Sequence, residues 1–173
     1  DHIVCEERCR KTVDAFQRVP GYNVAHPQSA NILRRYGQHM INLGNHALAT
    51  IALGKALEMY KQCFGEERPC FDILSTQAYI GEKLWKEGNH QAGLSMCEEA
   101  VRGLTCLGDV VALMRTADIH HRLGLLYLDA GNTATAKMQL ETASTIFLET
   151  SGDSKHPMVV EIDNKLKEIS NTK

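Results

Sequence analysis

The chain has 173 residues, of which 43% are hydrophobic and 23% charged, and its formal net charge is −2. This length suits one compact domain, and the apolar content is too high for a chain that stays disordered. No run of about 18 apolar residues could cross a membrane, and the basic excess that nucleic-acid-binding proteins carry is missing. Composition therefore favours a globular protein whose partners are neither nucleic acid nor membrane.

The cysteines, at positions 5, 9, 63, 70, 97 and 106, bear on the cellular compartment. A chain of this length can form a core without disulfides, and most of these cysteines fall within helical patterns, where cysteine behaves as a small apolar residue. We therefore expect reduced thiols and a cytoplasmic protein, with the nucleus as the alternative compartment. Because the first residue is Asp1 rather than Met, we also expect a larger parent chain.

Apolar residues recur at helical spacing along most of the chain. Tyr36 and Met40 lie in one such pattern, Ile51 in the next and Met138 in a later one, and we expect all of them to face the core. The prolines fall between the patterns, where a missing backbone N–H does no harm. In chain order, we predict helices at residues 2–18, 28–43, 46–64, 70–87, 90–106, 109–130, 133–150 and 157–170.

Small residues recur at the same offsets in three windows. Gly-Asn dipeptides begin at Gly44, Gly88 and Gly131, which are 44 and 43 residues apart, and such spacing is typical of helical repeat arrays. Another glycine stands seven residues before the glycine of each dipeptide. Small residues stand five and twelve residues after the glycine of each dipeptide. We interpret the dipeptide as a turn between two helices, and the other small residues as places where helices come close. These residues are Gly37, Ala49 and Ala56, then Gly81, Gly93 and Ala100, then Gly124, Ala136 and Ala143.

The last predicted helix is amphipathic. Met158, Ile162, Leu166 and Ile169 form one apolar stripe, and the opposite face is charged. Because a polar-faced helix is the usual end of a helical repeat array, we expect this helix to cap the structure.

These offsets resemble the tetratricopeptide repeat (TPR), which carries small and large residues at such intervals within a unit of about 34 residues. The match covers residues 28–150. The longer spacing looks like repeats of the kinesin-light-chain type, whose units often join through Gly-x-x-His-Pro. His26-Pro27 and His156-Pro157 match the end of that joint, whereas only Gly108-Asp109 stands between the second and third units.

The resemblance implies an all-α fold, namely a right-handed α-α superhelix. It is a TPR-like solenoid of three helix pairs with N-terminal and C-terminal capping helices. We expect a single helical repeat domain over residues 1–173. Its parts would be an N-terminal helix and linker at 2–27, repeats at 28–69, 70–108 and 109–156, and a capping helix at 157–173.

The concave side of such a solenoid is lined by the first helix of each pair. Arginines there could grip a carboxylate or an acidic peptide bidentately, and Trp85 could serve as an aromatic anchor. The simpler alternative is that Trp85 is packed in the core and that the arginines are solvated. The lining residues that the resemblance implies are Asn31, Arg34, Arg35, Gln38 and Asn42, then Ala78, Glu82, Trp85 and Lys86, then Asp118, His121, Arg122, Leu125 and Asp129.

One TPR subfamily clamps the terminal carboxylates of chaperone tails with basic and Asn residues. In this chain Tyr79 stands where that clamp needs Asn, and Asp118 stands where it needs Lys. Because a negative charge at Asp118 would repel a carboxylate, we do not expect chaperone-tail binding.

We expect a non-enzymatic module that holds a protein or peptide partner in its groove, without a cofactor or a metal. The sequence has no Gly-rich phosphate loop, no His-Glu-x-x-His and no Gly-x-Ser-x-Gly, and Cys5 with Cys9 forms a single candidate ligand pair. Residues 121–169 are also similar to the C-terminal helical domain of SET-MYND lysine methyltransferases. An accessory domain of such an enzyme is therefore the alternative, and an all-helical enzyme is a third hypothesis.

Overall fold

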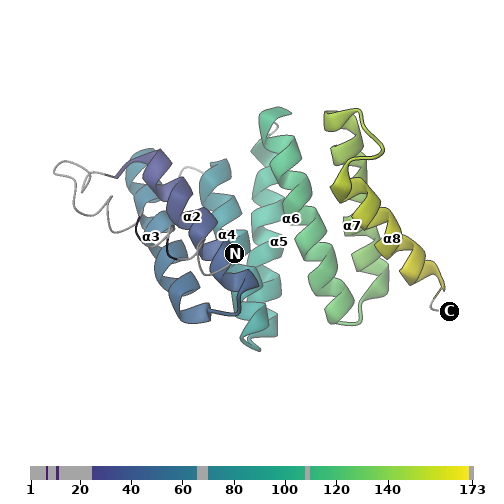
Figure 1. Cartoon of the computed structure of the whole chain (residues 1–173), viewed down its shortest axis with the longest axis horizontal. Helices are drawn as coiled ribbons and strands as arrows, with labels where there is room; N and C mark the ends of the chain where they lie inside the picture. The colour runs from purple at the N-terminus through teal and green to yellow at the C-terminus, as the bar shows by residue number, and fades with distance from the viewer. Residues whose placement is uncertain (1–6, 8–10, 12–24, 66–69, 108–109, 172–173) are drawn as a thin grey trace.

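A computed structural model of the chain describes residues 7, 11, 25–65, 70–107 and 110–171. Every regular element within them is a helix (Figure 1). Each lies within one residue of a predicted helix at both ends, so the all-helical prediction is confirmed for this part of the chain. Of the helix predicted at 2–18, only residues 7 and 11 are described. The helices are α2 (Pro27–Asn42), α3 (His46–Phe64), α4 (Phe71–Lys86), α5 (His90–Leu107), α6 (Val110–Asp129), α7 (Thr133–Ser151) and α8 (Pro157–Asn171).

The helices pack side by side in an order close to that of the chain (Figure 1). The tightest packing joins α2 with α3, α4 with α5, and α6 with α7, which makes three pairs. Each pair then contacts the next element through its second helix, since α3 packs on α4, α5 on α6 and α7 on α8. The first helices also meet, because α2 contacts α4 and α4 contacts α6. This arrangement is compatible with a helical solenoid.

The Gly-Asn dipeptides form the turns within the pairs, as predicted. Gly44, Gly88 and Gly131 have φ values of +73°, +88° and +76°, in the left-handed region that glycine adopts without steric strain. The asparagines after the first and third glycines begin the next helix, because their side chains accept a backbone N–H: Asn45 from Leu48 and Asn132 from Thr135, each at 3.2 Å.

The His-Pro dipeptides begin two helices in the same way. The backbone N–H of Gln28 donates to Nδ1 of His26 (3.2 Å), and that of Met158 donates to Nδ1 of His156 (3.3 Å). The proline that follows each histidine is the first helical residue, where its fixed φ suits the helix and its missing N–H leaves nothing unsatisfied. His-Pro therefore acts here as a cap for α2 and α8.

The glycines before the turns bring the two helices of each pair into contact. An added Cβ would lie under 3.0 Å from the side chain of the residue sixteen positions later, so the three glycines hold equivalent places in the three pairs. At Gly37 the nearest atoms belong to Leu53, one helical turn beyond Ala49. The contacts are Gly37 with Leu53 (2.5 Å), Gly81 with Cys97 (2.6 Å) and Gly124 with Leu140 (2.8 Å).

The alanines after the turns lie between consecutive pairs. Ala56, Ala100 and Ala143 are 0%, 1% and 0% exposed, and each belongs to a cluster of buried residues that joins its own helix to the next pair or to α8. The expectation for Ile51 and Met138 is wrong, because both are 55% exposed. They lie on faces of α3 and α7 that no described helix covers, since apolar spacing alone does not show which side of a helix is buried.

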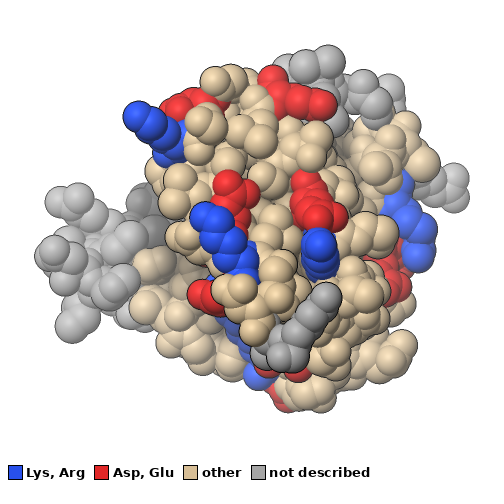
Figure 2. All heavy atoms as spheres, turned by 90° about the vertical axis from the view of Figure 1, so that its right-hand side faces the viewer, with Lys and Arg blue, Asp and Glu red and all other residues tan. Residues whose placement is uncertain are grey.

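Helix α8 covers the end of the array next to α7. Val159 and Ile162 are buried in one cluster with residues of α6 and α7, and Met158, Leu166 and Ile169 pack against it half-buried. Figure 2 looks onto this end of the molecule and shows acidic and basic side chains interspersed over it. The predicted apolar stripe thus faces inward, and the face of α8 that points away from the array is polar.

Candidate functional site

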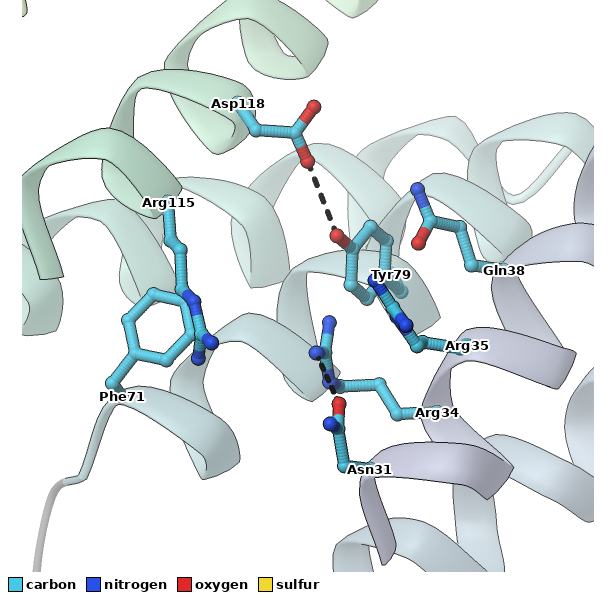
Figure 3. Close-up of a pocket in the computed structure, with 8 residues that line it drawn as sticks. All are labelled: Asn31, Arg34, Arg35, Gln38, Phe71, Tyr79, Arg115 and Asp118. Atoms are coloured by element: carbon cyan, nitrogen blue, oxygen red, sulfur yellow. Dashed lines mark hydrogen bonds between the residues drawn. The ribbon is translucent and has the colours of Figure 1, made fainter. Parts of the chain in front are cut away.

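A pocket of about 430 Å³ lies where the first helices of the three pairs meet. Figure 3 shows the side chains of α2, α4 and α6 that surround it. Three lining residues are arginines and a single one is acidic, which gives the pocket a positive character. The lining residues are Asn31, Arg34, Arg35 and Gln38 from α2, Phe71 and Tyr79 from α4, and Arg115 and Asp118 from α6.

The α2 wall of the pocket follows from helical periodicity. Asn31, Arg34, Arg35 and Gln38 are separated by three, one and three residues, so they share one helix face. All four belong to the set that the TPR resemblance implied. Asn42, also in that set, is exposed at the last position of α2 and does not line the pocket.

Arg34 is the most buried of the pocket arginines, with 7% of its surface exposed. Its Nη2 donates to Oδ1 of Asn31 (2.7 Å), its guanidinium carbon lies 5.6 Å from the centre of the Tyr79 ring, and its Nε is buried without a hydrogen-bond partner in the described structure. Arg35, one position on, is exposed. No described carboxylate lies within 4.0 Å of Arg34 or Arg35.

Arg115 supplies the third guanidinium from the opposite wall. Its guanidinium carbon lies 5.1 Å from the centre of the Phe71 ring. Its Nη1 lies 3.9 Å from Oδ1 of Asp72, and its side chain is 57% exposed. An ion pair this long and this exposed holds an arginine weakly, so the head group can still reach another anion.

Asp118, the one acidic lining residue, is already engaged. The Tyr79 hydroxyl donates to its Oδ2 (3.1 Å), and Nε of Arg122 donates to the same oxygen (3.0 Å). Burial raises the pKa of Tyr79, and the charge of Asp118 raises it further. Burial lowers the pKa of Arg122, but the carboxylates of Asp118 and Glu82 outweigh it, so the pKa of Arg122 is raised and its charge is secure.

Three bonds between α4 and α6 occupy most of the face on which we expected a groove. Besides the Tyr79–Asp118 bond, Nη1 of Arg122 lies 2.6 Å from Oε2 of Glu82, and the indole N–H of Trp85 donates to Oδ2 of Asp129 (2.6 Å). The polar groups that we expected to line a groove thus have hydrogen-bond partners within the fold. The open pocket is confined to the end of α4 and α6 where α2 meets these two helices.

Trp85 is packed, as the simpler alternative held. It is 7% exposed, and its ring stacks on His90 with centroids 4.4 Å apart. The expectation of an exposed aromatic anchor at Trp85 is therefore wrong, because the indole ring stacks on α5 and its N–H donates to α6.

The other predicted lining residues lie outside the pocket. Ala78 is 3% exposed, Leu125 is half-buried, and Lys86 pairs with Glu82 (3.0 Å). His121 is 5% exposed, and its Nε2 lies 3.9 Å from Glu161 of α8 rather than near the arginines. Burial lowers the pKa of His121, which makes it a neutral packing residue.

Sequence reasoning missed Phe71 and Arg115 as pocket residues. Arg115 stands three residues before Asp118, so extending the expected α6 stripe by one turn toward its start would have found it. Phe71 is the first residue of α4 and stands seven residues before Ala78, so extending the expected α4 stripe by two turns toward its start would have found it as well.

The side chains that line the pocket are suited to contacting an anion. Its lining offers guanidinium and amide groups, one engaged carboxylate and one phenol, but no thiol or imidazole. The described residues contain no group of three His, Cys, Asp or Glu that could hold a metal ion. In the same part of the chain, no helix combines the length and apolar character needed to span a membrane.

No protein-family model matches the chain, and no curated protein matches it in sequence.

Proposed function

We propose that this chain is a non-enzymatic protein-interaction module that binds a segment of a partner protein along the first helices of its pairs. In this proposal the helix pairs form a TPR-like right-handed solenoid, and α2, α4 and α6 line its concave groove. The arginine-lined pocket carries the proposal, because it lies where these three helices converge and because Arg34 and Arg35 have no carboxylate partner among the described residues.

The amides beside the arginines support a peptide as the ligand. Asn31 and Gln38 lie on the pocket face of α2 (Figure 3), and an amide side chain can both donate to and accept from a peptide backbone. Guanidinium groups add directional contacts to an acidic group on the same segment. The partner is thus an extended segment with at least one anionic group.

We place the protein in the cytoplasm or the nucleus. Among the described cysteines, Cys63, Cys97 and Cys106 are free thiols, which suits a reducing compartment.

Peptide selection tests the proposal. The full chain is used to select peptides from a library of random twelve-residue sequences, and the affinity of the selected peptides is measured by calorimetry. Arg35→Ala should weaken binding at least fivefold, since Arg35 lines the pocket, whereas Lys55→Ala, at an exposed site on α3, should leave affinity unchanged. Both sites are exposed, so neither variant should alter the melting temperature. Selection of no peptide, or equal binding by the Arg35 variant, would contradict the proposal.

A further inference from the structure

The cations of the pocket outnumber its available anions. Arg34 and Arg35 have no described carboxylate within 4.0 Å, and Arg115 has one at 3.9 Å on an exposed edge. The charge of Asp118 is matched by Arg122 at 3.0 Å. An empty pocket therefore holds about two uncompensated positive charges, which a ligand with a single carboxylate would not balance.

The buried side chain of Arg34 is a second, independent indication that the pocket binds a ligand. It is more than nine-tenths buried and lines the pocket, yet its Nε has no hydrogen-bond partner in the described structure. A buried donor on a charged group is costly to leave unpaired. A bound anion with several acceptor oxygens would satisfy it.

Two of the three guanidinium groups lie against aromatic rings of α4 in this structure. Arg34 lies over Tyr79 and is bonded to Asn31, and Arg115 lies over Phe71. Figure 3 shows these side chains reaching into the same space from α2 and α6. Guanidinium groups fixed on aromatic faces lose little freedom on binding, and their planar forks fit the oxygens of a phosphate group.

We propose that this pocket binds a phosphorylated side chain of the partner segment, so that phosphorylation of the partner strengthens binding. The inference rests on the proposed function and deepens it. A phosphate monoester carries about −1.5 to −2 charges at pH 7 and three acceptor oxygens. It thus matches the surplus charge of the pocket, which the single charge of a glutamate does not.

The charges around the pocket favour a single phosphate group on a polypeptide over a polyanion such as a nucleic acid. Asp118 lines the pocket, Asp72 lies 3.9 Å from Arg115, and the chain as a whole carries a net charge of −2. A nucleic acid or an anionic membrane needs a continuous basic surface. An isolated cluster of three arginines instead fits a single dianion.

The test uses the full chain and three capped pentapeptides of the form Gly-Gly-X-Gly-Gly, with phosphoserine, serine or glutamate at X, alongside inorganic phosphate. Binding is followed through the arginine Nε–H signals in NMR spectra. The phosphoserine peptide should shift the signals of Arg34 and Arg35 and bind at least tenfold more tightly than the glutamate and serine peptides. It should also bind more tightly than inorganic phosphate, since Asn31 and Gln38 contact the backbone.

Lowering the pH gives a second readout. The second pKa of a phosphate monoester is about 6, so affinity for the phosphoserine peptide should fall at least threefold between pH 7.5 and pH 5. Affinity for the glutamate peptide should change little over that range. Arg35→Ala should abolish the preference for phosphoserine, Arg35→Lys should restore part of it, and Lys55→Ala should leave it intact.

Equal affinity for the phosphoserine and glutamate peptides would overturn the inference. So would tighter binding to vesicles that contain phosphatidylinositol phosphate than to the phosphoserine peptide, because the site would then serve a membrane. If the peptides from library selection bind in an Arg35-dependent manner but the phosphoserine peptide does not, this inference fails while the interaction module stands.

Discussion

Replacing Gly81 with alanine tests the close contact between α4 and α5. The added Cβ would lie 2.6 Å from Sγ of Cys97 and 2.7 Å from the carbonyl oxygen of Gly93. The second neighbour is backbone, so relief requires the two helices to separate. Overpacking of a well-packed contact costs about 1–3 kcal/mol, and alanine returns up to about 1 kcal/mol of helix propensity. Because a backbone atom is in the way, the cost lies near the upper end of that range, and we expect the free energy of unfolding to fall by about 2 kcal/mol.

Gly54→Ala is the matched control for this substitution. Gly54 lies in the middle of α3, is exposed, and has nothing within 4 Å of an added Cβ. Alanine should therefore raise the free energy of unfolding by about 0.5–1 kcal/mol. Urea unfolding followed by circular dichroism measures both variants. If Gly81→Ala is as stable as Gly54→Ala, the glycine does not set the distance between the helices.

Three further predictions use the same unfolding assay. Ala100→Leu should lower stability by about 1–3 kcal/mol, because Ala100 is 1% exposed in the cluster that joins α5 to α4 and α6; a change within error would place it away from that contact. Tyr79→Phe should cost about 1 kcal/mol through loss of the bond to Asp118, and a stabilised variant would contradict this. Burial lowers the pKa values of His120 and His121, so the unfolded chain binds more protons below pH 6.5, and stability should fall from pH 7 to pH 5. His120→Gln should flatten that slope, and an unchanged slope would show that His120 is not the cause.

The helices and their turns could be predicted from sequence because their signals are local. Gly-Asn dipeptides and His-Pro caps act within a few residues, and the small residues recur at fixed offsets, so errors at the helix ends stay within one residue. The face of α2 that lines the pocket follows from the same periodicity, since Asn31 and Gln38 are seven residues apart.

The contacts between α4 and α6 could not be predicted in this way. Tyr79 and Asp118 are 39 residues apart, and Trp85 and Asp129 are 44 apart. Whether such pairs meet depends on how one helix pair is set against the next, which no local pattern records. The burial of Arg34 has the same origin, because α4 covers a side chain that helical spacing alone would leave in solvent.

A spin-labelled peptide tests whether the partner segment lies along the first helices of the pairs. A peptide from the selection, carrying a nitroxide spin label, should broaden NMR signals of residues on the pocket side, such as Arg35, Gln38 and Arg115. Signals of Lys55 and Met138, exposed on α3 and α7, should keep their intensity. Broadening centred on Lys55 and Met138, with the pocket signals unaffected, would contradict the account.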